Sequence, residues 1–221
     1  MQWVADLWWR LVRFGFRLLY NELAFTYDLV SKAVSLGAWR CWQNAAVRHI
    51  QHPGLILELA HGTGDLQIDL MRAGYNTIGY DLSPHMGRIA RHKLQRQGLK
   101  AVFTQGEAQR LPFSDQAFDT VISTFPTDFI FASETLSEVW RVLAPGGRLI
   151  VVPSGVLLGG GAVRRFLEWL YAITGQRNEQ DASVWPRITA RFNAHGFETS
   201  LVQEKCIRQS VAFVLIADKK V

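Results

Sequence analysis

The chain has 221 residues, of which 48% are hydrophobic and 19% charged, and it carries a formal net charge of +5. This length and composition exclude a disordered or low-complexity protein and allow one sizeable globular core. Two distant cysteines, Cys41 and Cys206, and scattered histidines argue against a disulfide framework and a metal site, so we expect no bound metal and a reducing cytoplasm.

The opening segment, residues 1–21, has the pattern of a strongly apolar helix. Its polar residues recur at spacings of three and four, which on a helix gathers them into one narrow stripe. They are Gln2, Asp6, Arg10, Arg13, Arg17 and Asn21. The remaining surface is rich in aromatic side chains, and it must be buried in a bilayer, in a partner or against the chain's own domain.

Several interpretations of this helix compete. The interleaved arginines argue against a membrane span and against a cleaved signal peptide. We favour a helix in the membrane interface, with its arginines toward phosphate headgroups, which predicts peripheral contact through residues 1–20. Docking on the chain's own domain as a lid, or on a second subunit in a homodimer, stays open as the alternative.

The segment from Leu55 to Leu66, LILELAHGTGDL, is the most informative part of the chain. An apolar strand runs through Glu58 and opens by way of Gly62 and Gly64 into a helix. Such glycines let a ligand approach the backbone, and the helix N-terminus offers unpaired N–H groups. The loop has no third glycine and no GK[ST] motif, which argues against a dinucleotide site and a phosphate loop.

Asp81 ends the next apolar run, residues 76–81. A carboxylate there can accept hydrogen bonds from both hydroxyls of a ribose. Together with the glycine loop, it predicts a site for a ribose-containing cofactor. The helix after Asp81 is basic, and we expect a solvated outer face from its residues Arg88, Arg91, Lys93, Arg96 and Lys100.

Apolar runs alternate with helical patterns along the rest of the chain. Strands are expected at 55–60, 76–81, 101–107, 118–125 and 148–154, with Pro145-Gly146-Gly147 stopping the helix before the last one. This alternation predicts an α/β fold with a doubly wound, mainly parallel sheet. A helix around 187–195 and two adjacent strands, 197–205 and 210–219, are expected to follow.

The ordered motifs resemble those of the class I S-adenosylmethionine (SAM)-dependent methyltransferases. They are the glycine loop Glu58–Asp65, the acid Asp81, the segment Gly106–Ala108 followed by LPFSDQAFDTVIS, and RVLAPGGRLIVV from Arg141. The resemblance implies a Rossmann-like, seven-stranded sheet with an antiparallel final strand. Residues 51–221 would form this domain, after N-terminal helices in residues 1–50.

Residues 25–43, FTYDLVSKAVSLGAWRCWQ, are further similar to the N-terminal signature of the ubiquinone and menaquinone biosynthesis C-methyltransferases. The matching residues are Tyr27, Asp28, Ser35, Gly37, Trp39, Arg40 and Trp42. The resemblance implies SAM as cofactor, held at the positions of Thr63, Asp81, Glu107 with Ala108, and Thr124. We expect the cofactor site to be completed by Tyr27, Glu58, Ala60, Gly62, Gly64, Leu82 and Met86.

The chain departs from the quinone enzymes on the acceptor side. Their Gly-x-Arg-Asn run after strand four is replaced by residues 125–130, and their Asn after Tyr-Asp-x-x is Ser31. The second residue of their glycine loop is His61 here, and residues 155–161 and 166–175 replace their acidic-tyrosine segment. The SAM half therefore carries over, whereas the acceptor does not.

Methyl transfer from a sulfonium is an in-line displacement, so the enzyme's main task is to hold donor and acceptor together and exclude water. Methylation of carbon or oxygen also needs a base. Asp28, His61 and Asp128 are the candidates for this base. Asp28 has an equally good interpretation as a helix cap or salt-bridge partner, and His61 as a neutral imidazole lining the loop.

We expect a methyltransferase for a hydrophobic small molecule or lipid, with a polyprenyl quinone precursor as first choice, reached at the inner face of the cell membrane. A nucleic-acid partner is disfavoured because the sequence has no RNA-binding module and no Asn-Pro-Pro-Tyr-like motif. Two alternatives remain open. One is a methyltransferase for a soluble metabolite with the N-terminal helices as a lid, and the other is a non-catalytic SAM-binding partner subunit.

Overall fold

The computed structural model describes residues 24–52, 54–100, 102–158 and 184–220, together with Arg10 and Gly15. The expected interfacial helix at 1–21 and the aromatic helix at 166–175 therefore lie outside the described residues, apart from those two single positions. Among the helices that are described, none is long and apolar enough to cross a membrane.

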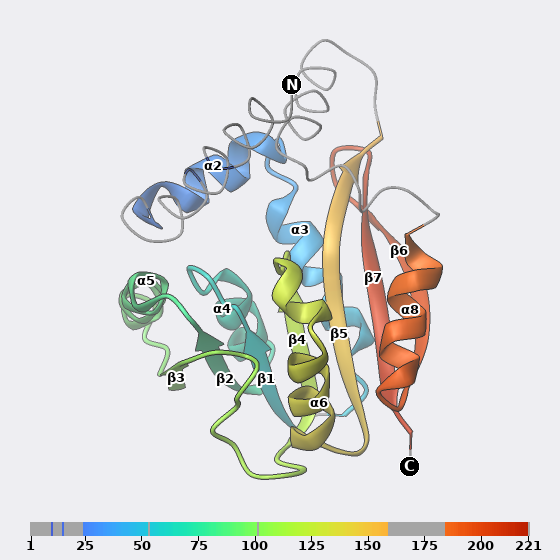
Figure 1. The fold of residues 1–221 in the computed structure, drawn as a ribbon. Helices are drawn as coiled ribbons and strands as arrows, with labels where there is room; N and C mark the ends of the chain where they lie inside the picture. Colours follow the sequence, from blue (N-terminus) through green and yellow to red (C-terminus); the bar gives the residue numbers. More distant parts are fainter. Residues whose placement is uncertain are drawn as a thin grey trace.

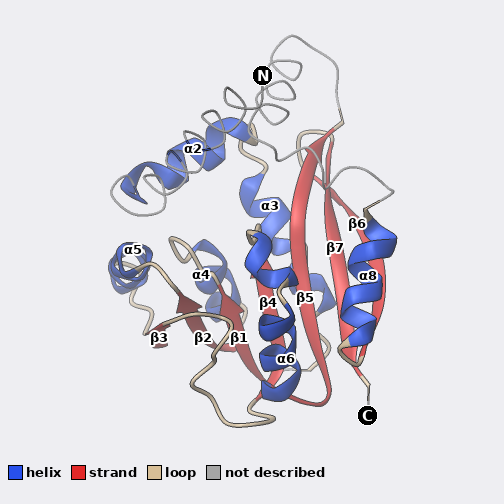
Figure 2. Cartoon of the chain, viewed as in Figure 1, coloured by secondary structure: helices blue, strands red, loops and turns tan. Residues whose placement is uncertain are grey.

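A seven-stranded mixed sheet forms the centre of the molecule, with strand order β3-β2-β1-β4-β5-β7-β6 (Figure 2). The first five strands pair in parallel, and β7 runs antiparallel to both of its neighbours. The strands are β1 Leu55–Leu59, β2 Asn76–Asp81, β3 Val102–Gln105, β4 Phe118–Thr124, β5 Leu143–Leu157, β6 Phe197–Cys206 and β7 Ser210–Lys219. The predicted α/β fold with an antiparallel ending is confirmed.

Helices cover both faces of this sheet (Figure 1). They are η1 Ala24–Thr26, α2 Tyr27–Val34, α3 Trp39–Asn44, η2 Ala46–His49, α4 Asp65–Arg72, α5 Pro84–Gln95, η3 Asp128–Phe131, α6 Ser133–Val142 and α8 Trp185–Ala194. One buried core joins the sheet to α6 and α8 through residues such as Val139 and Phe192. A second core joins the opposite face to α3 and α4 through residues such as Trp42 and Leu66.

Strand β5 is longer than the expected range of 148–154. It extends to Leu157 because the long strand β7 pairs with it antiparallel as far as Leu157 and Ser210. At its other end the Pro145–Gly147 turn is included, with a register shift against β4 between Phe118 and Thr120. Strand β3 is shorter than expected, since its pairing with β2 begins at Val102 and ends at Gln105.

Helix α3 is fixed to the far half of the sheet by one large side chain. Trp42 is 1% exposed, and its indole Nε1–H donates to Ser210 Oγ at 2.9 Å. A Cβ on Gly155 would lie 2.1 Å from the Trp42 ring, so β5 needs a glycine at this point. This contact sets the position of the aromatic residues at the start of α3.

The carboxyl ends of the parallel strands meet at one edge of the sheet, where ligands bind in open α/β folds. The glycine loop follows β1 at this edge, and Asp81 and Thr124 end β2 and β4 there. Helices α2 and α3 lie beyond the same edge (Figure 1). The fold therefore gathers the expected cofactor residues and the N-terminal signature in one region.

Candidate functional site

The glycine loop leaves β1 through a left-handed turn. Ala60 has a φ of +56°, and its N–H donates to Tyr80 O at 2.7 Å, which ties the loop to β2. Gly62 has a φ of +54°, and a Cβ built there would meet no atom within 4 Å. Gly62 thus combines a backbone conformation that favours glycine with an open face that a ligand can approach.

Gly64 serves a different purpose from the expected one. Its φ is +82°, and an added Cβ would lie 2.9 Å from Ala90 Cβ and 3.1 Å from Leu94 Cδ1. These atoms belong to α5, so this glycine allows a close helix contact rather than ligand access. The two glycines of one motif therefore have separate physical reasons.

The Asp81 carboxylate holds the glycine loop in place. Its Oδ2 accepts from the Gly62 N–H at 2.9 Å, and its Oδ1 accepts from the Ser83 N–H at 2.8 Å. A carboxylate oxygen has a second lone pair, so both oxygens can still accept from ribose hydroxyls. Asp81 is consequently a structural anchor for the open backbone at Gly62.

The segment after β3 lies beside Asp81. The Gly106 N–H donates to Asp81 O at 3.1 Å, which brings Glu107 and Ala108 next to the end of β2. Leu82 is 64% exposed and offers an apolar surface suited to a flat ring. Met86 is only 1% exposed and lies on the buried side of α5.

Glu58 is a buried carboxyl group next to this loop. Its side chain is 1% exposed, and burial raises its pKa to about 8, against the opposing effect of the Gln67 amide. Its Oε2 has no hydrogen-bond partner among the residues that the structure describes. An orphaned acceptor of this kind fits a cofactor that carries a cationic group. With the open face at Gly62 and the carboxylate of Asp81, the residues present fit SAM.

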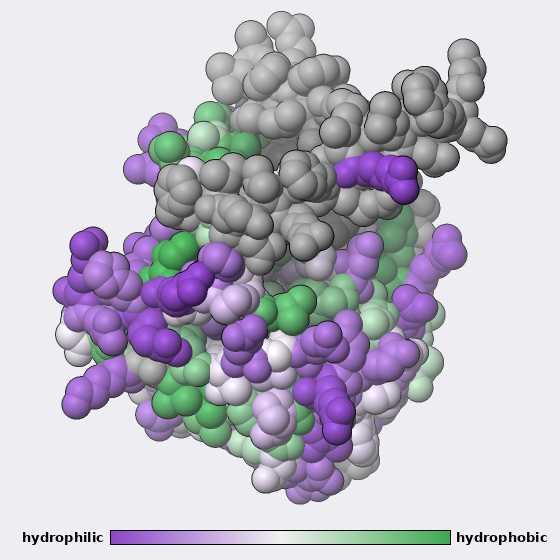
Figure 3. All heavy atoms as spheres, turned by 60° about the vertical axis from the view of Figure 1, so that its left-hand side comes forward, coloured by the Kyte–Doolittle hydropathy of each residue, from purple (hydrophilic) through white to green (hydrophobic). Residues whose placement is uncertain are grey.

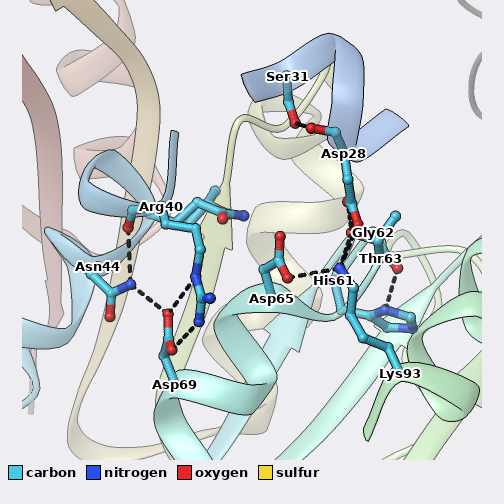
Figure 4. A network of polar contacts seen from close by, with 12 residues as sticks. Asp28, Ser31, Arg40, Asn44, His61, Gly62, Thr63, Asp65, Asp69 and Lys93 are labelled. Carbon is cyan, nitrogen blue, oxygen red and sulfur yellow. Dashed lines mark hydrogen bonds and ion pairs between the residues drawn. The ribbon is translucent and has the colours of Figure 1, made fainter. Parts of the chain in front are cut away.

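A polar network joins the glycine loop to α2, α4 and α5 (Figure 4). Lys93 Nζ donates to Asp28 Oδ2 at 2.6 Å, to Asp65 Oδ1 at 2.7 Å and to Thr63 Oγ1 at 3.3 Å. The Thr63 hydroxyl in turn donates to Asp28 Oδ1. Sequence reasoning placed Lys93 on a solvated face and missed this role. Lys93 lies between Ala90 and Leu94, two buried residues of α5. This position in the sequence could have predicted that its side chain is directed toward the protein interior.

His61 turns away from this network. Its ring lies 4.6 Å from the Phe103 ring, its Nδ1 is 2.9 Å from Gly62 O, and the side chain is 3% exposed. Burial lowers the pKa of His61, although the charge of Asp81 opposes the shift. The geometry is that of a neutral imidazole packed under the loop against β3.

Aromatic rings collect where β4 ends. The Trp39 and Phe125 rings are stacked with centroids 3.9 Å apart, and Tyr27 meets Trp39 edge-on at 6.2 Å. Phe125 has a φ of +51°, a strained conformation for a bulky residue. Thr124 is buried, and its Oγ1 accepts from Gln43 Nε2 at 3.4 Å. We name the rings of Tyr27, Trp39 and Phe125 the acceptor wall.

Asp128 begins η3, four residues after β4 ends at Thr124. Its side chain is exposed and makes no hydrogen bond or ion pair with any part of the chain that the structure describes. Of the three expected bases, Asp28 is thus engaged by Lys93 and Thr63, His61 is packed against Phe103, and Asp128 is open to solvent.

Comparison with known proteins agrees with this geometry. The model of the ubiE/COQ5 methyltransferase family matches residues 16–172. A demethylmenaquinone methyltransferase of Deinococcus radiodurans is 30% identical over 91% of each chain. Another, from Thermus thermophilus, is 41% identical over 61% of this chain, and that match spans 63% of the relative's length. A ubiquinone/menaquinone biosynthesis C-methyltransferase of Bartonella tribocorum is 31% identical over 60% of this chain and 55% of its own.

Solved structures share the fold at low sequence identity. A methyltransferase from Methanococcus maripaludis, described as S-adenosyl-L-methionine-dependent, superposes with a TM-score of 0.66 at 18% identity and covers 91% of this chain and 94% of its own. The PH0226 protein of Pyrococcus horikoshii gives a TM-score of 0.60 at 20% identity, covering 92% and 96%. At such identities these structures support the fold alone.

Proposed function

Because the chain belongs to the ubiE/COQ5 methyltransferase family, we propose that it methylates a hydrophobic quinone precursor, a polyprenyl quinone precursor first of all. It is a class I SAM-dependent methyltransferase by family and by fold. The observation that carries the choice of acceptor is the relationship to demethylmenaquinone methyltransferases, one of which aligns over 91% of both chains. The acceptor wall supports it, because stacked aromatic rings suit a flat apolar ring.

The residues proposed to hold the cofactor lie at the ends of two neighbouring strands, β1 and β2. Asp81 accepts hydrogen bonds from the ribose, Gly62 leaves its open face to the ligand, and Leu82 covers the base with apolar surface. Glu58 provides negative charge toward the cationic part of the cofactor when it is ionised. SAM, when bound, supplies a methyl group activated by its sulfonium.

On the acceptor side, the chain orients a ring, excludes water and removes a proton. Trp39 and Phe125 present aromatic surface at the end of β4, and such surface keeps water away from the transferred methyl group. Methylation at carbon requires loss of a proton from the acceptor. We assign this task to Asp128, because its carboxylate is exposed and has no side-chain partner within the described segments.

The place of the reaction is part of the proposal. We propose that residues 1–21 lie in the membrane interface and bring the site to a membrane-bound acceptor, because their arginine stripe and apolar remainder suit that position. A soluble aromatic metabolite is the second candidate acceptor. The observation that favours it is the replacement of the Gly-x-Arg-Asn run by residues 125–130, since that run lies on the acceptor side.

The test measures transfer of labelled methyl from SAM to two acceptors with the same head group. One is a reduced demethylquinone with a long prenyl tail in anionic vesicles, and the other is a tail-free naphthoquinol in solution. We expect methylation of the prenylated acceptor, and we expect a chain that starts near Asn21 to lose most of it. Equal turnover of both acceptors by both chains would favour the soluble metabolite. Turnover of neither, with SAM bound, would overturn the quinone assignment.

A further inference from the structure

We infer that Lys93 is a positioning residue that fastens α2 to the cofactor loop and so keeps the acceptor wall closed over the site of methyl transfer. The inference rests on the proposed function for its consequence, and on the geometry of the network for its mechanism. Lys93 lies on α5, outside the residues expected to bind cofactor or acceptor.

The ammonium of Lys93 uses its donors on three different elements. It has three N–H groups, and its partners are Asp28 on α2, Asp65 on α4 and Thr63 in the glycine loop. The two oxygens of Asp28 are both engaged, one by Lys93 and one by the Thr63 hydroxyl. One cation thus links the helix, the loop and the start of α4 through charge-assisted hydrogen bonds, which are the strong class.

Besides the edge-on contact of Tyr27 with Trp39, helix α2 buries little apolar surface among the described residues. Leu29 is 71% exposed and Val30 is 38% exposed. Ser31 is the one buried residue of this helix, and its hydroxyl donates to Asp28 O in the same helix. Burial of apolar surface is the usual means of docking a helix. Because α2 buries little apolar surface, we attribute a large share of its docking to the ionic link between Lys93 and Asp28.

The close approach of α5 to the loop delivers the ammonium to this point. A side chain on Gly64 would collide with Ala90 and Leu94, and Ala90 lies three residues before Lys93 on the same helix face. The other basic residues of α5, such as Arg88, Arg91 and Arg96, are exposed. Figure 3 shows hydrophilic side chains gathered on the side of the molecule that carries this helix. Lys93 therefore differs from the other basic residues of α5, because its side chain is directed toward the glycine loop and not toward solvent.

The consequence for the reaction follows from Thr63 and Tyr27. Thr63 belongs both to the network and to the expected cofactor site, and Tyr27 precedes Asp28 at the start of α2. Cofactor loop and acceptor wall are thus coupled through one hydroxyl and one ammonium. When Lys93 is removed, α2 is released more often, and bound cofactor is free to leave through the opened wall.

The first experiment measures amide hydrogen exchange in the full chain without ligand. Lys93→Gln and Asp28→Asn each remove the link from one side, Lys93→Arg conserves the charge, and Arg96→Gln is the control from the exposed face of α5. We expect exchange of α2 to become about tenfold faster in the first two variants, an effect typical of losing a charge-assisted contact. Strands β1 and β4 should be unchanged, and Lys93→Arg should restore part of the protection.

The second experiment measures the rate of SAM release by stopped-flow and the kinetics with the prenylated acceptor. We expect Lys93→Gln to release SAM about tenfold faster and to raise KM for the acceptor more than it lowers kcat, since the wall is looser but the reacting groups remain. Unaltered α2 exchange in both neutral variants would overturn the inference. If exchange responds but no methyl is transferred by the unmodified protein, the network stands and the proposed function fails.

Discussion

The cofactor side and the acceptor side of this site are built in different ways. On the cofactor side, the contacts run between backbone groups and one carboxylate, as in the bonds from Gly62 and Ser83 to Asp81. On the acceptor side, side chains contact side chains, as in the Trp39 and Phe125 stack and the link from Lys93 to Asp28. The cofactor side therefore requires a particular side chain at few positions, whereas the acceptor side requires one at many positions.

This difference predicts that the cofactor side tolerates substitution of side chains better than the acceptor side does. A backbone N–H that binds a carboxylate is present whatever the neighbouring side chains are, so the loop tolerates His61 at its second position. A wall of rings changes shape with every substitution. The cofactor half can therefore stay constant while residues 125–130 adapt to a particular acceptor.

The largest effect is expected on the acceptor side, for Asp128→Asn. The change keeps the size of the side chain but removes its basicity, so kcat should fall by about 100-fold, the low end of the contribution of a general base. SAM affinity should be unchanged, because Asp128 is not among the residues proposed to hold the cofactor. The measurement is steady-state kinetics together with SAM titration calorimetry, and Asp115→Asn is a control at another exposed carboxylate. Full turnover by Asp128→Asn would remove it as the base.

The fold and the cofactor loop were largely predictable from the sequence because their signals are local. The alternation of apolar runs and the left-handed positions at Gly62 and Gly64 can be recognised within a few residues of one another. What could not be predicted depends on residues that are distant in sequence. The bond from Trp42 to Ser210 and the need for glycine at position 155 are examples, since each requires knowledge of which strand neighbours α3.

The network at Lys93 was missed for the same reason. Counting charges along α5 gives a basic helix, and the one inward-facing lysine is distinguished from the others only by its register against the buried residues Ala90 and Leu94. Its partner Asp28 lies 65 positions away, on a different helix. The pairing therefore needs the three-dimensional arrangement.

The two glycines of the loop offer the next largest effect, which concerns stability. Gly64→Ala combines a positive φ with a clash against α5, so we expect it to lower the free energy of unfolding by about 3 kcal/mol. Gly62→Ala has only the unfavourable φ, and about 1 kcal/mol is expected. Urea unfolding of both variants at one pH measures this difference. An equal decrease in the free energy of unfolding of both variants would mean that α5 shifts to accommodate the added methyl group without a loss of stability.

Replacement of Asp81 tests the backbone-based side directly. Asp81→Ala deprives the Gly62 and Ser83 N–H groups of their acceptor and removes the proposed ribose contact, so SAM binding should weaken by about 2 kcal/mol. Asp81→Asn retains one acceptor oxygen and should lose less. Calorimetric titration with SAM and with S-adenosylhomocysteine provides the measurement. Unchanged affinity in Asp81→Ala would remove the cofactor assignment at this strand end.

Glu58 introduces a pH dependence into the stability of the fold. Burial raises its pKa to about 8 in the folded protein, well above the value of about 4.3 for a free glutamate. Between these two values the folded chain binds a proton that the unfolded chain has released, so this group makes stability fall as pH rises. Glu58→Gln removes the ionisation and keeps a neutral side chain of the same shape. The variant should therefore be less pH-sensitive than the parent between pH 5 and 8, and its stability advantage over the parent should grow as the pH rises toward 8.

The same substitution should affect the cofactor in the opposite direction. If the ionised Glu58 carboxylate faces the cationic part of SAM, binding draws the group toward its charged form, and SAM affinity of the parent rises with pH up to about 8. Glu58→Gln should abolish that rise while it stabilises the fold. Urea unfolding and SAM titration at pH 6, 7 and 8 separate the two effects. A stability gain with an unchanged pH profile of SAM binding would restrict Glu58 to a structural role and leave Asp81 as the charged contact on the cofactor side.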